Sequence, residues 1–193
     1  MGRIVHIVAY DNKGVIGLKD KLPFNIPEDL KQFKDLTADS LICMGYNTFQ
    51  SIVDNHMQNK TKFLEGRKVA VVCSVASKAN QRNKQYNPIY DNVNFFDKDT
   101  FQHLVTRNNA PIIIVGGKQL YKMFSPSLII ATEVDIDSVA ANPTIEEADI
   151  VKYPSLTLPF DPQAPQNVRI KRLPMEEKVS ATGTKYRTVV YTL

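Results

Sequence analysis

Short runs of apolar and often β-branched residues recur along the chain and predict β-strands. These runs are Ile4–Ala9, Leu41–Met44, Val69–Val72, Val93–Phe96, Ile112–Val115 and Leu128–Val134. The first, third and fifth are continuously apolar and do not alternate with polar residues. Because such strands are buried on both faces, they are typical of a parallel or mixed sheet that is covered by helices.

Amphipathic segments lie between these runs and predict helices at Pro27–Leu36, Tyr46–Ile52, Asp99–Thr106 and Lys118–Phe124. The alternation of strands and helices indicates an α/β architecture. Near the end of the chain, Val168–Leu173 and Tyr186–Thr192 flank a turn region that contains Thr182-Gly183-Thr184. This pattern predicts an antiparallel hairpin at an edge of the sheet.

The 193 residues are enough to bury a core without disulfides or metals. We therefore expect one α/β domain over residues 1–193, with a central, mostly parallel mixed sheet, flanking helices and the C-terminal antiparallel hairpin. Five of the eleven prolines fall between Pro143 and Pro165. They predict an irregular surface excursion at about 139–167, since proline disfavours both helices and central strands.

Composition excludes disorder and fibrous structure, because 43% hydrophobic and 23% charged residues are ordinary globular values. The net charge of +4 is too modest to indicate a polyanionic partner. Between Lys60 and Lys84, seven side chains are basic and one, Glu65, is acidic. This segment could hold an anionic ligand, although a charge run alone favours a solvated loop face. No aromatic platform or recognition helix accompanies it, so we expect no nucleic-acid partner.

Cys43 and Cys73 lie inside apolar runs without a C-x-x-C spacing, as expected for small core residues in a reducing compartment. The three histidines show no metal-ligand spacing, so no metal site is predicted. The chain has no signal-like apolar region near its start and no apolar run of membrane-spanning length. We expect a soluble, cytoplasmic protein without a membrane partner.

Candidate chemistry begins at the helix predicted after Ile26. Pro27 suits the first turn of a helix, and Glu28 and Asp29 suit its positive end, so both acids have a purely structural explanation. Asp29 and Phe33, however, are four residues apart and share one face of the helix. If that face points inward, a carboxylate is buried beside an aromatic ring, which is costly unless a ligand or a donor pairs with it.

Two further segments pass from a strand through glycine into a helix. Ile112–Val115 is followed by Gly116-Gly117 and Lys118, and Met44 is followed by Gly45. Glycines at such positions let the backbone approach phosphate, although a tight turn would also require them. ATP hydrolysis, a standard Rossmann site and serine hydrolysis are disfavoured because their motifs are missing. The residues alone therefore indicate a dinucleotide-binding α/β protein with one unusual acid.

At these positions the chain resembles the dihydrofolate reductase family, from Ile4 to about Asp137. The motifs that carry the resemblance are Val15-Ile16-Gly17, Leu22-Pro23-Phe24-Asn25-Ile26-Pro27-Glu28-Asp29-Leu30, Met44-Gly45-Tyr46-Asn47-Thr48-Phe49, Leu64-Glu65-Gly66-Arg67 and Val115-Gly116-Gly117. The resemblance implies reduction of dihydrofolate to tetrahydrofolate by hydride transfer from NADPH.

The resemblance also implies roles for individual residues. Asp29 would be the acid of the pteridine pocket, supported by Thr132, with Leu22 and Phe24 beside the reacting atoms. Arg67 would bind the carboxylate of the substrate's glutamate tail. The other substrate-binding residues implied are Ile7, Leu30, Phe33, Ile52 and Lys62. The cofactor-binding residues implied are Ala9, Ile16, Gly17, Leu22, Gly45, Asn47, Thr48, Cys73, Ser74, Gly116, Gly117, Lys118, Gln119, Leu120 and Tyr121. The peptide between the two adjacent glycines would be cis.

The chain departs from the family pattern in several places. Tyr46 stands where a basic residue often contacts the 2′-phosphate of the cofactor, which leaves Ser74, Lys78 or Lys118 for that contact. Phe24 replaces a frequent tryptophan. The segment Val53–Phe63 is longer than usual, and the Gly-Asp-Thr-x-Phe-Pro run that commonly follows the position of Asp137 is missing.

Two alternative functions remain open. One is the related riboflavin-pathway pyrimidine reductase, which the Pro27-x-Asp29-Leu30 segment disfavours. The other is a non-catalytic binding or structural protein that retains the fold, which the intact Asp29, Arg67 and Thr132 disfavour. We expect a monomer that binds a small-molecule substrate.

Overall fold

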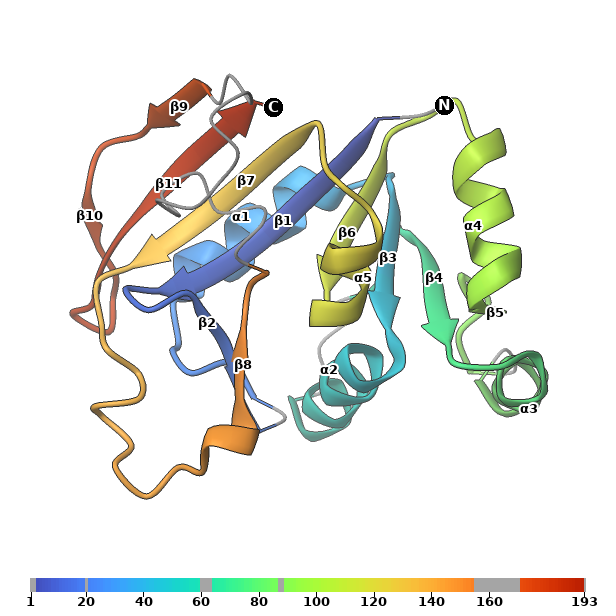
Figure 1. The fold of residues 1–193 in the computed structure, drawn as a ribbon, viewed down its shortest axis with the longest axis horizontal. Helices are drawn as coiled ribbons and strands as arrows, with labels where there is room; N and C mark the ends of the chain where they lie inside the picture. Colours follow the sequence, from blue (N-terminus) through green and yellow to red (C-terminus); the bar gives the residue numbers. More distant parts are fainter. Residues whose placement is uncertain (1–2, 20, 60–63, 87–88, 155–170, 193) are drawn as a thin grey trace.

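The structure is a computed structural model that describes residues 3–19, 21–59, 64–86, 89–154 and 171–192 (Figure 1). Its main sheet has nine strands in this part of the chain, in the order β10-β11-β7-β1-β6-β3-β4-β5, with β9 also paired to β11. The strands are β1 Ile4–Asp11, β3 Leu41–Gly45, β4 Lys68–Cys73, β5 Val93–Asp97, β6 Ile112–Gly116, β7 Leu128–Val134, β9 Lys171–Pro174, β10 Lys178–Val179 and β11 Lys185–Thr192.

The strands from β7 to β5 along this order are parallel, whereas β9, β10 and β11 are antiparallel additions at one side. The predicted mostly parallel mixed sheet and C-terminal antiparallel hairpin are therefore confirmed. The hairpin contains more pairing than the pattern indicated, because β9 and β10 both pair with β11. The predicted start of its first strand at Val168 lies outside the described residues.

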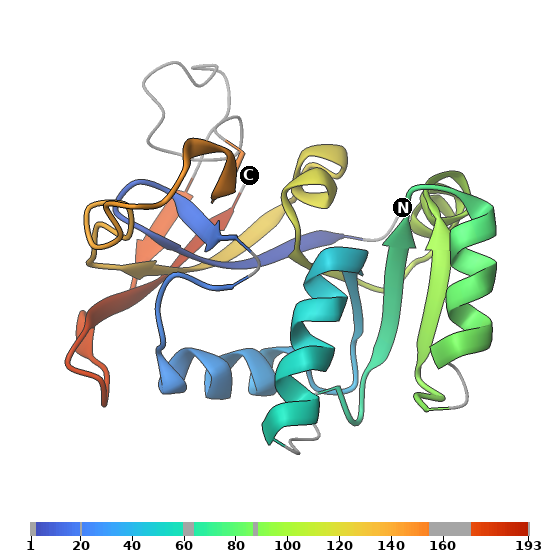
Figure 2. The ribbon, with the colours of Figure 1, turned by 90° about the horizontal axis from the view of Figure 1, so that it is seen from below.

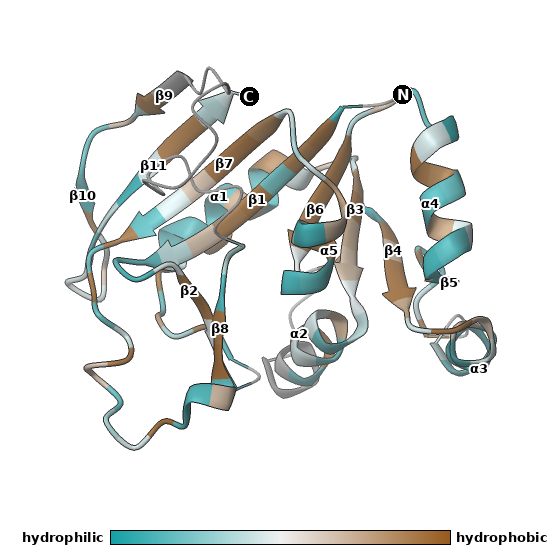
Figure 3. Ribbon diagram, viewed as in Figure 1, coloured by the Kyte–Doolittle hydropathy of each residue, from teal (hydrophilic) through white to brown (hydrophobic). Residues whose placement is uncertain are grey.

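Helices cover both faces of the sheet, and the two faces have separate cores (Figure 2). The helices are α1 Pro27–Thr37, α2 Tyr46–Asn59, α3 Ala76–Tyr86, α4 Lys98–Arg107 and α5 Lys118–Met123. Phe101 of α4 and Leu120 of α5 pack in one core, whereas Phe49 of α2 and Ala79 of α3 pack in the other. The strands between the layers are the most apolar part of the ribbon (Figure 3), as the continuous apolar runs predict.

Three elements differ from the sequence prediction. Helix α2 continues to Asn59 beyond the predicted end at Ile52, so part of the long 53–63 connection is helical. No helix was predicted within the basic segment Lys60–Lys84, yet Ala76–Tyr86 is helix α3. This helix escaped detection because only Ala79 and Tyr86 among its residues are buried, which leaves almost no apolar periodicity.

The third difference lies inside the proline-rich excursion. Residues 150–152 form strand β8 (Ile150–Lys152), which follows the short 3-10 helix Glu147–Asp149 and pairs antiparallel with β2 (Val15–Leu18). Part of the segment predicted to be irregular is therefore a strand, although it belongs to a separate two-stranded sheet. Residues 155–167 of the excursion lie outside the described residues.

Cys43 and Cys73 are buried and unpaired with each other, as predicted for core residues. Among the described helices, none has the length and apolar character needed to span a bilayer.

Candidate functional site

Asp29 lies where the first turn of α1 meets β7. Its carboxylate atom Oδ1 accepts a hydrogen bond from the Thr132 hydroxyl at 2.5 Å. Thr132 is buried in β7, and its register partner in the neighbouring strand β1 is Ala9. Two residues far apart in the sequence that were both assigned to the pteridine pocket are thus in direct contact.

The first turn of α1 is fixed by the residues around it. Ile26 is buried with Val134 and Tyr186 in a small cluster to which Phe24 adds its ring. Pro27 occupies the first turn, as its fixed φ favours, and the Asp29 N–H donates to the carbonyl of Ile26. The helix start therefore sets the direction in which Asp29 points.

The two adjacent acids have different surroundings. Glu28 Oε1 accepts a hydrogen bond from the N–H of Ala181 at 2.9 Å, so this carboxylate faces the tip of the C-terminal hairpin. Asp29 faces the sheet, and its burial raises the pKa of the carboxyl, partly opposed by the hydrogen bond from Thr132. A perturbed pKa of this kind is frequent at functional sites.

The apolar residues assigned to the substrate are spread around this point. Ile7 lies on β1 two residues before Ala9, and Ile52 lies on α2 with its side chain partly buried against the neighbouring core. Phe33 is half-buried on α1, whereas Leu30 is 45% exposed and Leu22 is 55% exposed. Both exposed leucines are available for contact with a ligand. Lys62 lies outside the described residues.

Arg67 is a buried cation whose guanidinium is held by the end of α1. Its Nε donates to the Thr37 hydroxyl at 2.8 Å and its Nη2 donates to the Lys34 carbonyl at 3.0 Å. Its Nη1 donates to the carbonyl of Glu65 at 2.8 Å. These three acceptors are neutral and orient the guanidinium. Burial lowers the pKa of Arg67, partly opposed by the charge of Asp39.

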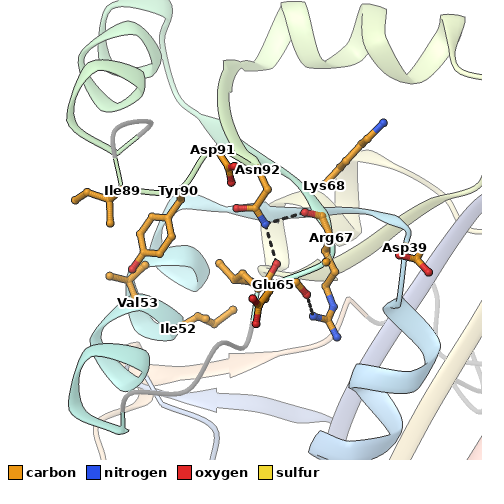
Figure 4. A pocket seen from close by; sticks show the side chains of 12 residues that line it. Asp39, Ile52, Val53, Glu65, Arg67, Lys68, Ile89, Tyr90, Asp91 and Asn92 are labelled. Carbon is orange, nitrogen blue, oxygen red and sulfur yellow. Dashed lines mark hydrogen bonds between the residues drawn. The ribbon is translucent and has the colours of Figure 1, made fainter.

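A cavity of about 560 Å³ adjoins Arg67 (Figure 4). Ile52 and Val53 of α2 line one side, and Tyr90 and Asn92 line another. The side-chain amide of Asn92 donates to the carbonyls of Leu64 and Arg67, so these bonds fix it in the cavity wall. The cavity thus brings together Ile52, which the resemblance assigns to the substrate pocket, and Arg67, which it assigns to the glutamate tail.

The strand ends that carry glycine form a second region of the candidate site. The peptide between Gly116 and Gly117 is cis, as the resemblance implies, and it faces Thr48 of α2. A Cβ added to Gly116 would lie 2.8 Å from Thr48 Cγ2, so this position has no room for a side chain. Gly45 differs, because a Cβ there would meet nothing within 4 Å. Its surface is therefore open to a ligand.

The cofactor-assigned residues follow the strand order of the sheet. Ala9 is on β1, Gly116 ends β6, Gly45 ends β3 and Cys73 ends β4, and these strands are consecutive neighbours. Because the strands are parallel, their carboxyl ends lie at one edge of the sheet, where open α/β sheets bind ligands. Asn47, Ser74, Lys118 and Gln119 are exposed next to these ends. Leu120 and Tyr121 are buried in the core, so contact by Leu120 would involve its backbone.

Ile16 and Gly17 lie on β2, which β8 covers. Gly17 pairs with Val151, and the N–H of Tyr153 donates to the carbonyl of Gly14 at 2.9 Å. Sequence reasoning missed this support, since it assigned no strand to the excursion. The only signal was the short apolar pair Ile150-Val151 before an aromatic residue.

A buried histidine was also missed. His6 of β1 is fully buried, and its Nε2 donates to the carbonyl of Phe124 at 2.8 Å. In the neutral tautomer that this bond requires, Nδ1 accepts from the Tyr153 hydroxyl at 2.7 Å. Burial lowers the pKa of His6 to about 4. The His6 side chain lies on the face of β1 opposite to that of Ile7 and Ala9. It therefore stabilises the strand from the other face of the sheet.

Comparisons with known proteins agree on one family. The sequence model described as dihydrofolate reductase matches residues 3–162. The dihydrofolate reductase of Buchnera aphidicola from Acyrthosiphon pisum is 33% identical over 135 residues, which cover 69% of this chain and 73% of that protein. An Escherichia coli protein, dihydrofolate reductase type 9, is 32% identical over 123 residues, covering 63% of each chain.

A solved structure supports the same fold. Dihydrofolate reductase from Enterococcus faecalis, complexed with NADP(H) and RAB-propyl, superposes with a TM-score of 0.66 and 20% identity. The superposition covers 99% of this chain and 96% of that chain. It therefore includes the C-terminal strands that follow the residues matched by the family model.

Proposed function

This chain belongs to the dihydrofolate reductase family, and we propose from this premise that the site around Asp29 reduces dihydrofolate to tetrahydrofolate with NADPH. The cofactor, when bound, supplies the hydride. The observation that carries the proposal is the pairing of Asp29 with Thr132, which holds one partly buried carboxylate at β7. In the sheet, β7 lies next to β1, which is followed by the strands whose ends would receive the cofactor.

The described residues fit a dinucleotide. Thr48 and the Gly116-Gly117 peptide lie so close together that only glycine can occupy position 116, and Gly45 leaves an open backbone surface beside them. The first turn of α2 adds N–H groups with no intrahelical partner, which favour phosphate oxygens. These residues would hold the phosphates, while Ala9 and Ile16 would lie along the nicotinamide end.

Asp29 would supply charge at the reacting end. Hydride transfer to the carbon of an imine is easier when the adjacent ring nitrogen carries a proton, and a nearby carboxylate stabilises that positive charge. Because Thr132 bonds Oδ1, the other oxygen of Asp29 is left for the ligand, since no described residue bonds it. Burial strengthens the interaction, because few water molecules screen the carboxylate.

Arg67 would bind the far end of the substrate. The neutral acceptors from Thr37, Glu65 and Lys34 hold its guanidinium in one orientation, and a carboxylate would add the charge-assisted bonds that those groups cannot make. The adjoining cavity, which Ile52 also lines, gives the apolar part of the substrate a place to pack.

We also propose that the enzyme is a cytoplasmic monomer. Its dimensions and composition are those of a chain that folds alone, and the sheet is covered by helices on both faces. Sedimentation velocity at several protein concentrations tests this, and a dimer at micromolar concentration would contradict it.

The activity is tested by following the absorbance of NADPH in the presence of dihydrofolate. We expect oxidation that requires both compounds and that stops when dihydrofolate is exhausted. The pyrimidine reductase alternative is tested in parallel with a ribosylated aminopyrimidine as the acceptor. Turnover of that compound without turnover of dihydrofolate would replace the proposed function.

A further inference from the structure

We infer that Arg82, together with the ring of Tyr46, is the residue pair that recognises the 2′-phosphate of NADPH and distinguishes it from NADH. The inference deepens the proposed function and rests on it, because it concerns the same cofactor site. The sequence comparison left Ser74, Lys78 or Lys118 for this contact, and Arg82 was not among them.

Arg82 lies flat on an aromatic ring. Its Cζ is 3.2 Å from the centroid of the Tyr46 ring, and its Nη1 donates to Cys73 Sγ at 3.1 Å. A guanidinium stacked on an aromatic ring keeps its N–H donors in the plane, directed outward from the edge of the stack. The two contacts therefore fix the plane of the guanidinium and leave other donors for a ligand.

Tyr46 is itself held in place. Its hydroxyl donates to Gln50 Oε1 at 2.9 Å, one turn further along α2, and its ring packs near Phe49 and Phe95. The helix that carries Arg82 is fixed as well, because Asn83 exchanges two hydrogen bonds with the backbone of Phe95 in β5. Both members of the pair thus belong to rigid elements, as a preorganised binding group requires.

The charge of Arg82 is not neutralised by an acid among the described residues. Its polar partner there is a thiol, and its second contact is a ring. Asp97 is the register partner of Cys73 in β5. The Asp97 carboxylate is already engaged, because it accepts from the N–H groups of Asp99 and Thr100 at the start of α4. Lys78, one turn before Arg82 on the same helix, adds a second positive charge.

The order of the strands places the positive charge of Arg82 at the adenosine end of the cofactor. Asp29 and Thr132 mark the hydride-accepting end at β7 and β1, and the glycines of β6 and β3 come next. Arg82 and Tyr46 lie where β3 and β4 end, on the side away from Asp29. A dinucleotide that extends along this edge brings its adenosine to this point. Lys118 follows β6 and is nearer the middle of that path.

A phosphate monoester is the group that this arrangement fits. Its dianion accepts two parallel bonds from a planar guanidinium, a geometry that a ribose hydroxyl cannot provide. The exposed hydroxyl of Ser74, the residue after Cys73, lies at the same strand end and can add a third bond. The pair therefore predicts selectivity for the phosphorylated cofactor rather than general affinity for nucleotides.

The test uses the full chain and two small probes, adenosine 2′,5′-bisphosphate and adenosine 5′-monophosphate, with binding measured by calorimetry. We expect Arg82→Gln to weaken binding of the bisphosphate by about 10- to 100-fold, the usual effect of losing a charged hydrogen bond. Binding of the monophosphate should change less than about twofold. Lys84→Gln, on another face of the same helix, is the matched control and should leave both affinities unchanged.

Substitutions of Tyr46 test the ring. Tyr46→Phe should retain the preference for the bisphosphate, whereas Tyr46→Leu should reduce it, because it removes the ring on which the guanidinium stacks. Arg82→Lys keeps a positive charge without the planar guanidinium, so it should give an intermediate loss of affinity for the bisphosphate. This variant also tests the role of Arg82 if Arg82→Gln folds poorly. Equal loss of both probes in the Arg82 variants, or an unchanged preference, would overturn the inference.

The kinetic counterpart is the ratio of kcat/KM for NADPH to that for NADH, which should fall in Arg82→Gln mainly through the NADPH value. A wild-type protein that binds the bisphosphate selectively but does not reduce dihydrofolate would contradict the proposed function and support the role of Arg82. An active enzyme whose cofactor preference is the same in Arg82→Gln would contradict only the role of Arg82.

Discussion

The hydroxyl of Thr132 donates to one carboxylate oxygen of Asp29 at 2.5 Å, across a sequence separation of 103 residues. This bond joins the first turn of α1 to β7, and no described residue bonds the second oxygen of Asp29. Glu28, the preceding residue, points instead to Ala181 in the hairpin. The site therefore contains one carboxylate in a defined orientation.

Replacing Asp29 by asparagine should lower kcat at pH 7 by roughly 10²–10⁴, because the amide keeps the shape but not the charge that favours a protonated ring nitrogen. The loss should become smaller as the pH is lowered, since protonation of the substrate in solution then replaces the missing effect. Rates measured from pH 5 to pH 8 test both parts. Glu28→Gln is the control and should retain most activity; a near-wild-type rate for Asp29→Asn would contradict the assigned role.

Arg67→Leu should raise the KM for dihydrofolate by about 10²-fold and change kcat less, because a tail contact is present in both ground and transition states. That scale corresponds to roughly 3 kcal/mol for a charged bidentate pair. Lys68→Gln removes the neighbouring exposed charge and should have little effect. Steady-state kinetics at varied dihydrofolate concentrations provide the measurement. A KM within threefold of the wild-type value would show that Arg67 does not bind the tail of the substrate.

Alanine at Gly45 and at Gly116 should have different consequences. Gly116→Ala places a methyl group 2.8 Å from Thr48 Cγ2, so we expect a loss of about 1–3 kcal/mol in the free energy of unfolding. Gly45→Ala meets no protein atom within 4 Å, so stability should change by less than about 0.5 kcal/mol.

The methyl group of Gly45→Ala would nevertheless occupy the surface assigned to the cofactor, and the KM for NADPH should rise at least about tenfold. Urea unfolding and cofactor kinetics on both variants make the comparison. Unchanged cofactor kinetics in Gly45→Ala would show that the dinucleotide does not pass this residue.

The stability of the fold should depend on pH through His6. Its pKa is about 4 in the folded protein and 6.5 in the unfolded chain, so the unfolded state binds the proton first as the pH falls. The free energy of unfolding should therefore decrease between about pH 7 and pH 4, by about 3 kcal/mol from this group at 1.36 kcal/mol per pKa unit.

Gln at position 6 can still bond Phe124 and Tyr153 but does not titrate, so His6→Gln should flatten this part of the profile. His103→Gln, an exposed histidine on α4, is the control. Denaturant unfolding at several pH values provides the measurement. A slope that His6→Gln leaves unchanged would assign the dependence to other groups.

Local patterns in the sequence determined the layout of the site. Continuous apolar runs predicted the parallel strands. The glycines at the ends of β3 and β6 predicted where a ligand could approach the backbone. Pro27 with Glu28 and Asp29 predicted the start of α1. Each of these signals depends on a few neighbouring residues, because strand burial, turn geometry and helix starts are set by local backbone preferences.

Contacts between distant segments were decided only in the tertiary structure. The sequence could not tell which of Glu28 and Asp29 faces the sheet, since both suit a helix start. It gave no sign that Tyr153 would bond His6 across 147 positions, or that β8 would cover β2. Helix α3 has so little apolar periodicity that its two bonds between Asn83 and Phe95, and the stacking of Arg82 on Tyr46, became visible only after folding. The physical reason is that such polar contacts depend on the relative placement of whole elements, and burial of the apolar strands determines that placement without leaving a local pattern at the polar residues.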